Sequence, residues 1–299
     1  MQPFANYRDN LCIDQKDCIF SGPLFRGKGD RPTKKLRDLC SPNSEDAITW
    51  SVFRTLLRLA PSLWFSWLLE RAVGESPITQ VYSPIEIHFW QSQLPPPSRM
   101  VWLLTHLDHP RVLDSTGARR WPQRLTRVKE KLDYWLGMAA EGRVRRGDEG
   151  CLEGPSEIDV ILYTPDTMVA IEAKYLSDIS KDITWDCRRD QLSRMIDVCL
   201  DINPSLHHYF LLITDERAHE EPKQYESLIR DYQQDLRFLE EALPHRRAEE
   251  LKSIQGSLGW TTWGEIGGFL EGYPASSDEE KEVVSNLLSY LKGKGLWPI

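Results

Sequence analysis

The chain has 299 residues, of which 40% are hydrophobic and 27% charged, and its formal net charge is −8. This composition excludes an intrinsically disordered chain, and the length suffices for one large α/β domain with insertions or for two modest domains. An acidic total does not favour non-specific binding of nucleic acid, so such a function requires a locally basic surface.

Charge is distributed unevenly along the chain. Residues 111–146 contain ten Lys or Arg against four Asp or Glu, whereas residues 215–299 contain ten basic against 17 acidic residues. The first stretch is therefore a candidate for contact with phosphate, although both stretches could equally be solvated faces of helices.

The cysteines and the apolar segments indicate in which cellular compartment the protein is expected. The six cysteines form no CxxC pair, and the chain opens on a polar segment without the pattern of a secretory signal. We therefore expect reduced thiols and a cytoplasmic protein. The apolar run over 52–72 is interrupted by Arg54, Arg58 and Pro61, which favours buried helices and no contact with a membrane.

The first predicted elements are an irregular N-terminal arm over 1–43 and a helix beginning at Asn43-Ser44-Glu45-Asp46. Polar caps followed by acids in the first turn are typical of a helix start. A second helix is expected over 63–72, and the alternation over 81–90 predicts a strand. The segment from about 91 to 150 is predicted to be a helical insertion.

A β-hairpin is predicted next, with strands over 157–163 and 168–174. The turn between them comprises residues 164–167, where Pro165 presets φ and the Asp166 side chain can bond to the backbone. The hairpin is the segment on which the functional prediction depends.

The elements after the hairpin complete an α/β pattern. We expect a helix over 186–200, a strand over 208–214 that is buried on both faces, and a helical C-terminal extension over 216–299 that packs on the core. The order helix, strands, helix, strand predicts a mixed central sheet flanked by helices.

The turn sets the register of the hairpin. If Tyr163 pairs with Met168, counting back along both strands places Asp159 opposite Glu172, with Cβ atoms about 4.5–5.5 Å apart. Glu172 and Lys174 then share one face, and Glu157 faces Lys174. The opposite face is wholly apolar and must be packed; it carries Ile158, Val160, Leu162, Val169, Ile171 and Ala173.

Two carboxylates and one amine thus meet at one point of a buried hairpin. Carboxylates this close repel each other, and a divalent cation relieves the repulsion. Mg²⁺ prefers few carboxylates, several waters and a phosphate oxygen, and it can acidify a bound water for attack on a phosphodiester. The plain structural interpretation is a Glu157–Lys174 ion pair beside a chance pair of acids.

Asp159, twelve intervening residues and then Glu172-Ala173-Lys174 resemble the PD-(D/E)XK nuclease superfamily, which includes type II restriction enzymes and many phage-defence nucleases. The resemblance implies a restriction-endonuclease-like core of helix, three strands, helix and strand over 44–215. It implies that Asp159 and Glu172 bind Mg²⁺, or alternatively Mn²⁺, with the carbonyl of Ala173 as a further ligand. Lys174 would serve the attacking water.

Two further positions fit the resemblance. Many members carry an acid on the first core helix, which Glu45 matches as an additional metal ligand, with Asp46 as the rival candidate. Many also carry a glutamine on the helix after the hairpin, which Gln191 matches. One departure is that Ile158, not proline, precedes Asp159. The literal Pro165-Asp166 lies in the turn, and we interpret it as a coincidence.

Nucleic acid, and DNA in particular, is the expected partner. Arg188 and Arg189 lie within one turn of Gln191 and are candidates for phosphate contact. Cutting both strands of a duplex usually takes two sites, so a homodimer or a protein partner is compatible with this function.

Our first hypothesis is therefore a magnesium-dependent endonuclease that acts on DNA in restriction or phage defence. A catalytically inactive nucleic-acid-binding or scaffold module on the same fold is the alternative, and an RNA-directed nuclease is a variant of the first hypothesis. A third hypothesis is an interaction protein that binds a partner through its acidic C-terminal part.

Overall fold

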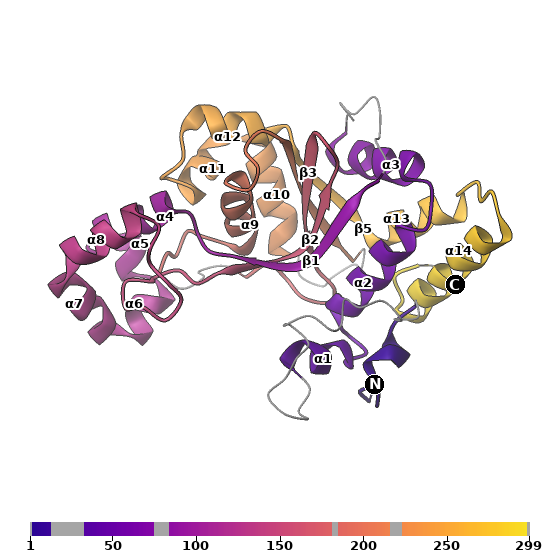
Figure 1. Ribbon diagram of the computed structural model, residues 1–299, viewed down its shortest axis with the longest axis horizontal. Helices are drawn as coiled ribbons and strands as arrows, with labels where there is room; N and C mark the ends of the chain where they lie inside the picture. The colour runs from indigo at the N-terminus through magenta and orange to yellow at the C-terminus, as the bar shows by residue number, and fades with distance from the viewer. Residues whose placement is uncertain (1, 13–32, 75–83, 181–184, 216–222, 298–299) are drawn as a thin grey trace.

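The computed structural model describes residues 2–12, 33–74, 84–180, 185–215 and 223–297. In these residues a five-stranded mixed sheet lies between two layers of helices, and a further group of helices lies beside it (Figure 1). The strands are β1 (Glu86–Gln93), β2 (Ser156–Tyr163), β3 (Thr167–Ala173), β4 (His207–Thr214) and β5 (Leu258–Thr262). The helices are η1 (Tyr7–Asn10), α1 (Lys34–Leu39), α2 (Glu45–Leu56), α3 (Pro61–Val73), α4 (Pro97–Thr105), α5 (Pro110–Leu113), α6 (Thr116–Arg120), α7 (Pro122–Glu130), α8 (Leu132–Ala140), α9 (Gln191–Leu200), α10 (Gln224–Gln234), α11 (Leu236–Ala242), α12 (Ala248–Gln255), α13 (Trp263–Glu271) and α14 (Asp278–Gly293).

The strands are ordered β1-β2-β3-β4-β5 across the sheet. The pairs β1–β2 and β2–β3 are antiparallel, whereas β3–β4 and β4–β5 are parallel. The α/β class and the mixed sheet flanked by helices are as the sequence predicts.

One strand was not expected. The segment after residue 216 was predicted to be helical, but β5 joins the sheet as an edge strand beside β4. Its five residues are too few to show a period, and Gly259 interrupts them. A Cβ at Gly259 would lie 2.7 Å from Leu211 and 2.9 Å from the backbone of Ala72. Glycine therefore lets α3 pack closely on this strand.

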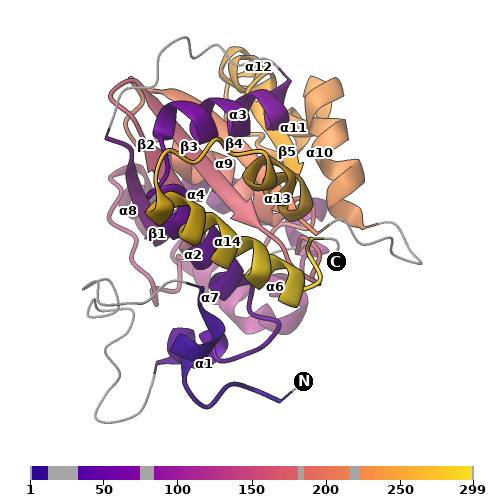
Figure 2. The same cartoon turned by 90° about the vertical axis from the view of Figure 1, so that its right-hand side faces the viewer.

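Each face of the sheet is covered by its own helices. The helices α2, α3, α13 and α14 pack on one face, and α9 to α12 pack on the other (Figures 1 and 2). Side chains of β3 point alternately to the two faces of the sheet and so pack in both cores. Val169 and Ile171 point to the first layer, and Met168 and Ala170 point to the second.

One residue of the hairpin lies on the face opposite to the expected one. Ile158 packs with the α9 layer, whereas Val160 packs with the α2 layer as predicted. The change of face coincides with a distortion in β1, where Trp90 adopts φ 52° between the pairs Phe89↔Val160 and Gln91↔Ile158. The strand therefore does not alternate regularly through this point.

The helices α4 to α8 form a group with its own apolar cluster around Leu103, Val128 and Trp135. This group lies at the far left of Figure 1, beyond α9. In the part of the chain that the structure describes, no helix combines the length and the apolar character needed to cross a membrane.

Candidate active site

The β2–β3 hairpin has the register that the turn predicts. Tyr163 pairs with Met168, and the ladder continues in step to the pair Val160↔Ile171. The N–H of Thr164 donates to the carbonyl of Thr167 at 2.9 Å, which closes the turn. Asp159 and Glu172 are the next residues beyond this ladder.

At that point a hydrogen bond from the backbone to the Asp159 side chain connects the two strands. Its Oδ2 accepts the backbone N–H of Ala173 at 2.9 Å. The Asp159 carboxylate thereby lies against the Glu172–Lys174 segment, and its half-buried side chain still reaches a cleft on the surface.

Lys174 is at the centre of the site. Its Nζ donates to Oε1 of Glu172 and, at 2.9 Å, to the carbonyl of Ala173, and it lies 3.5 Å from Oε1 of Glu45. The Glu157–Lys174 ion pair of the plain structural interpretation does not form: Glu157 pairs with Lys35, and Lys174 pairs with Glu172. The ammonium therefore lies among the oxygens that the sequence predicts as metal ligands.

The structure decides between the two acids at the start of α2. Ser44 caps the helix through the N–H of Ala47, which leaves Glu45 as its first residue. Oε2 of Glu45 accepts the N–H of Tyr175 at 2.9 Å. Asp46, in contrast, pairs with Lys35. Glu45 is thus the acid that faces Lys174.

Gln191 is the first residue of α9 and also reaches the site. Its Nε2 donates to Oε1 of Glu172, as the position of this helix after the hairpin suggested. The helix start is fixed by a capping box between Asp190 and Ser193. Side chains from α2, β2, β3 and α9 therefore meet at the end of the hairpin.

Burial sets the protonation of these groups. Loss of solvent raises the pKa of Glu172 to about 7. Loss of solvent, and after it the charge of Glu172, holds the pKa of Asp159 well above its usual range. The charges of Glu172 and Glu45 outweigh desolvation at Lys174 and raise the pKa of its ammonium. The site therefore holds two crowded carboxyl groups beside one firmly protonated amine.

The oxygens present fit a small divalent cation better than a closed metal cage. Oε2 of Glu172 is buried without a hydrogen-bond partner. The charge of Glu172 acts on Asp159, and Oε1 of Glu172 and the carbonyl of Ala173 accept from the same ammonium. Within the described ranges, no group of three or more His, Cys, Asp or Glu is arranged to hold a metal ion. Two carboxylates and a carbonyl would leave further positions to water, which suits Mg²⁺.

The site opens into a cleft of about 770 Å³. Asp159, Glu45 and Gln191 line it from the core, and Lys34 and Lys35 of α1 line it from the N-terminal arm. Sequence reasoning missed Lys35, because a lysine in an irregular arm carries no periodic or motif signal.

The two arginines predicted to contact phosphate have different environments. Arg188 is exposed and pairs with Glu241. Arg189 is 0% exposed; its Nε donates to Glu153 at 3.0 Å and its Nη2 to Asp197 at 2.6 Å. The prediction for Arg189 is therefore corrected: its guanidinium links the buried acids Glu153 and Asp197 and cannot reach a nucleic acid in this conformation.

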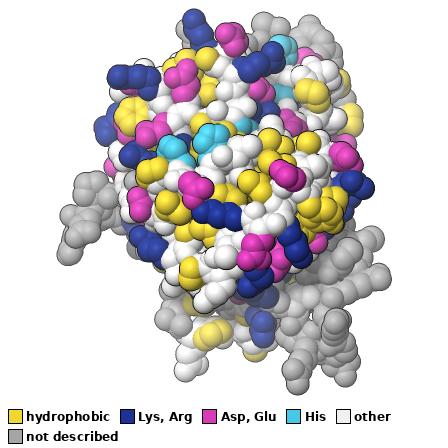
Figure 3. All heavy atoms as spheres, turned by 90° about the vertical axis from the view of Figure 1, so that its left-hand side faces the viewer, with side chains coloured by type: hydrophobic (Ala, Val, Ile, Leu, Met, Phe, Trp, Pro, Cys, Tyr) yellow, Lys and Arg dark blue, Asp and Glu magenta, His cyan; other side chains and the backbone are white. Residues whose placement is uncertain are grey.

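The basic stretch over 111–146 is partly internal as well. Arg111 is buried against Asp186, and Arg124 binds backbone carbonyls that include that of Cys151 at 2.7 Å. On the face formed by this helical group, basic side chains alternate with acidic and apolar ones (Figure 3). Several are ion-paired, among them Arg127 with Glu149.

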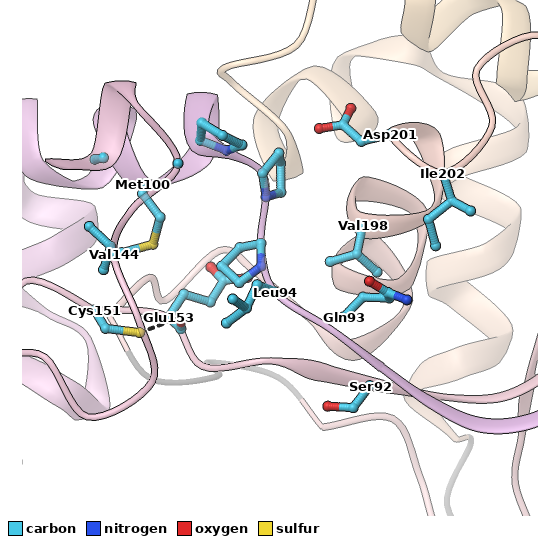
Figure 4. Close-up of a pocket in the computed structure, with 15 residues that line it drawn as sticks. Ser92, Gln93, Leu94, Met100, Val144, Cys151, Glu153, Val198, Asp201 and Ile202 are labelled. Atoms are coloured by element: carbon cyan, nitrogen blue, oxygen red, sulfur yellow. Dashed lines mark hydrogen bonds between the residues drawn. The ribbon is translucent and has the colours of Figure 1, made fainter. Parts of the chain in front are cut away.

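A second cavity, of about 410 Å³, is separate from the cleft beside Asp159. Figure 4 shows it between Met100 and Val144 of the helical group and Val198 and Ile202 of the α9 side, with Gln93 at the end of β1 below. None of the predicted site residues lines it, and its walls are largely apolar.

No protein-family model matches the chain, and comparisons with curated proteins and with solved structures find no match.

Proposed function

We propose that the chain is a magnesium-dependent endonuclease that hydrolyses phosphodiester bonds of DNA, as in restriction or defence against phage. The observation that carries the proposal is the meeting of Asp159, Glu172 and Lys174 at the open end of one hairpin. Glu45 and Gln191 join them from separate helices.

The arrangement of the elements supports a restriction-endonuclease-like fold. Apart from α3 and α4–α8, which lie between these elements, the order α2, β1, β2, β3, α9, β4 agrees with the helix, three strands, helix and strand that the resemblance to the PD-(D/E)XK superfamily implies. The candidate site residues lie at the end of the hairpin and at the starts of α2 and α9, as the resemblance implies.

Asp159, Glu172 and the carbonyl of Ala173 are the groups that would hold Mg²⁺, with Glu45 at the edge of the set; Mn²⁺ is the alternative ion. A bound ion would acidify a water and offset charge on the phosphate. Glu45 fixes the strand end through the N–H of Tyr175, and Gln191 orients the carboxylate of Glu172.

The protonation of Lys174 suggests its role. Neighbouring carboxylates raise the pKa of its ammonium, and the ammonium donates to Glu172 and to the carbonyl of Ala173, so we propose Lys174 as a hydrogen-bond donor. It would orient the attacking water and donate to the oxygen on which negative charge develops.

The hairpin offers a matched control for the test. Purified protein is incubated with plasmid DNA, linear DNA or RNA and with Mg²⁺ or Mn²⁺, beside Asp159→Asn, Lys174→Met and Asp166→Asn. Asp166 is an exposed turn residue that bonds to Thr164 and Thr167, so Asp166→Asn should cleave like the unaltered chain. The other two variants should lose cleavage by orders of magnitude.

Equal cleavage by all four proteins would reject the site. Tight nucleic-acid binding without cleavage by any of them would reject the enzyme and favour the alternative, a nucleic-acid-binding or scaffold module. Cleavage of RNA alone would transfer the proposal to an RNA-directed nuclease.

A further inference from the structure

Lys35 connects the N-terminal arm to both walls of the cleft. Its Nζ donates to Asp46 of α2 at 2.7 Å and to Glu157 of β2 at 2.8 Å. The ammonium also lies 4.7 Å from the centre of the Trp90 ring. Asp46 follows Glu45 and Glu157 precedes Asp159 by two positions, so Lys35 bridges the two elements that supply site carboxylates.

The cleft is acidic as it stands. Among the residues that the structure describes, its charged lining side chains are two lysines and five acids, a formal balance of −3: Lys34, Lys35, Asp38, Glu45, Asp46, Glu157 and Asp159. A polyanion is repelled from such a surface unless cations meet it there. Lys174 is only 4% exposed and pairs with Glu172, so among the described residues that line the cleft the remaining cations are Lys34 and Lys35 of α1.

We propose that Lys35 is a substrate-binding residue that contacts a backbone phosphate beside the one that is cleaved. The inference rests on the proposed nuclease function and names the group that holds the substrate strand. In the free protein Asp46 and Glu157 hold the ammonium at the rim. On binding, the phosphate replaces these partners while the Trp90 ring continues to support the cation.

Three features make this exchange feasible. The Glu157 side chain is 45% exposed and the Lys35 side chain 11% exposed, so the carboxylate that releases Lys35 regains its hydration at once. The four-carbon stem of a lysine lets the ammonium move while the backbone stays in place. Moreover, α1 lies next to the start of α2, where the site opens (Figure 1).

The first test measures binding separately from cleavage. Binding of a short DNA duplex is titrated by fluorescence anisotropy with Ca²⁺ in place of Mg²⁺, for the unaltered chain, Lys35→Ala and Lys281→Ala. Lys281 is an exposed lysine on α14 that pairs with Asp278 and serves as a control of equal charge. Loss of one phosphate contact should raise Kd by about eightfold at 0.1 M salt and lower the salt slope by about 1. Lys281→Ala should change neither quantity.

A second test separates phosphate binding from a purely structural role. Asp46→Asn together with Glu157→Gln releases Lys35 from both acids. If Lys35 binds phosphate, adding Lys35→Ala in that background should weaken binding at least as much as it does in the unaltered chain. If Lys35 only offsets these acids or anchors the arm, the added substitution should have no effect, which would overturn the proposal.

The outcomes also distinguish this inference from the proposed function. A chain that cleaves DNA while Lys35→Ala leaves Kd and the salt slope unchanged would overturn the role of Lys35 alone. A chain that neither binds nor cleaves nucleic acid would overturn both.

Discussion

The backbone N–H of Tyr175 donates to Oε2 of Glu45 at 2.9 Å, although 130 positions separate the two residues. This bond fixes the start of α2 to the residue directly after Lys174. Glu45 thus contacts both the amine of Lys174 and the backbone of Tyr175, whereas its neighbour Asp46 pairs with Lys35.

Glu45→Gln and Asp46→Asn should therefore differ in effect. Glu45→Gln removes a negative charge beside Lys174 and should lower the single-turnover rate at saturating DNA by about 10- to 100-fold, the usual effect of groups that orient metal ligands. Asp46→Asn should leave that rate unchanged. Equal rates for the two variants would contradict the assignment of Glu45.

Asp159→Asn should separate activity from stability. The amide oxygen can still accept the N–H of Ala173, but the charge that repels Glu172 is gone. Cleavage should be lost, while the free energy of unfolding without metal should rise by about 1 kcal/mol. Urea denaturation in EDTA measures the gain. A less stable Asp159→Asn protein would show that the carboxylates are not in conflict.

The pH dependence of stability should report Glu172. Burial raises its pKa from 4.5 to about 7. Since the folded pKa lies above the unfolded one, the stabilising contribution is complete below about pH 4.5 and is lost as pH rises through about 7. At about 1.4 kcal/mol per pKa unit, the loss without metal amounts to at most about 3 kcal/mol.

Glu172→Gln should flatten that part of the profile, as measured by urea denaturation in EDTA at pH 5, 6, 7 and 8. Mg²⁺ added at pH 8 should stabilise the unaltered chain more than Glu172→Gln, because a ligand that binds only the folded state shifts the equilibrium toward it. Parallel pH profiles for the two proteins would exclude a raised pKa at Glu172.

Substitutions of the adjacent residues Arg188 and Arg189 should have different effects on the free energy of unfolding. Arg189→Met leaves the buried acids Glu153 and Asp197 without their shared partner and should cost about 3–5 kcal/mol of stability. Arg188→Met removes an exposed side chain and should stay within about 0.5 kcal/mol. Thermal unfolding of the two variants measures this difference, and equal melting temperatures would argue against the buried role of Arg189.

The sequence alone determined the hairpin and its register. A four-residue turn with Pro165 and Asp166 leaves one pairing that buries the apolar faces, and a shift by one residue would expose them. It follows from this local geometry that Asp159, Glu172 and Lys174 lie close together. The capped start of α2 and the amphipathic α9 were likewise evident, because caps and helical periodicity are local signals.

Tertiary packing decided what local patterns leave open. Glu45 and Asp46 are adjacent acids in one helical turn, and only the placement of α2 against the end of β3 directs Glu45 to Lys174. Arg189 is buried because its partners Glu153 and Asp197 arrive from distant parts of the chain. Lys35 lines the cleft because α1 packs beside the start of α2. Such contacts depend on the relative placement of whole elements, and the spacing of residues along one element does not encode that placement.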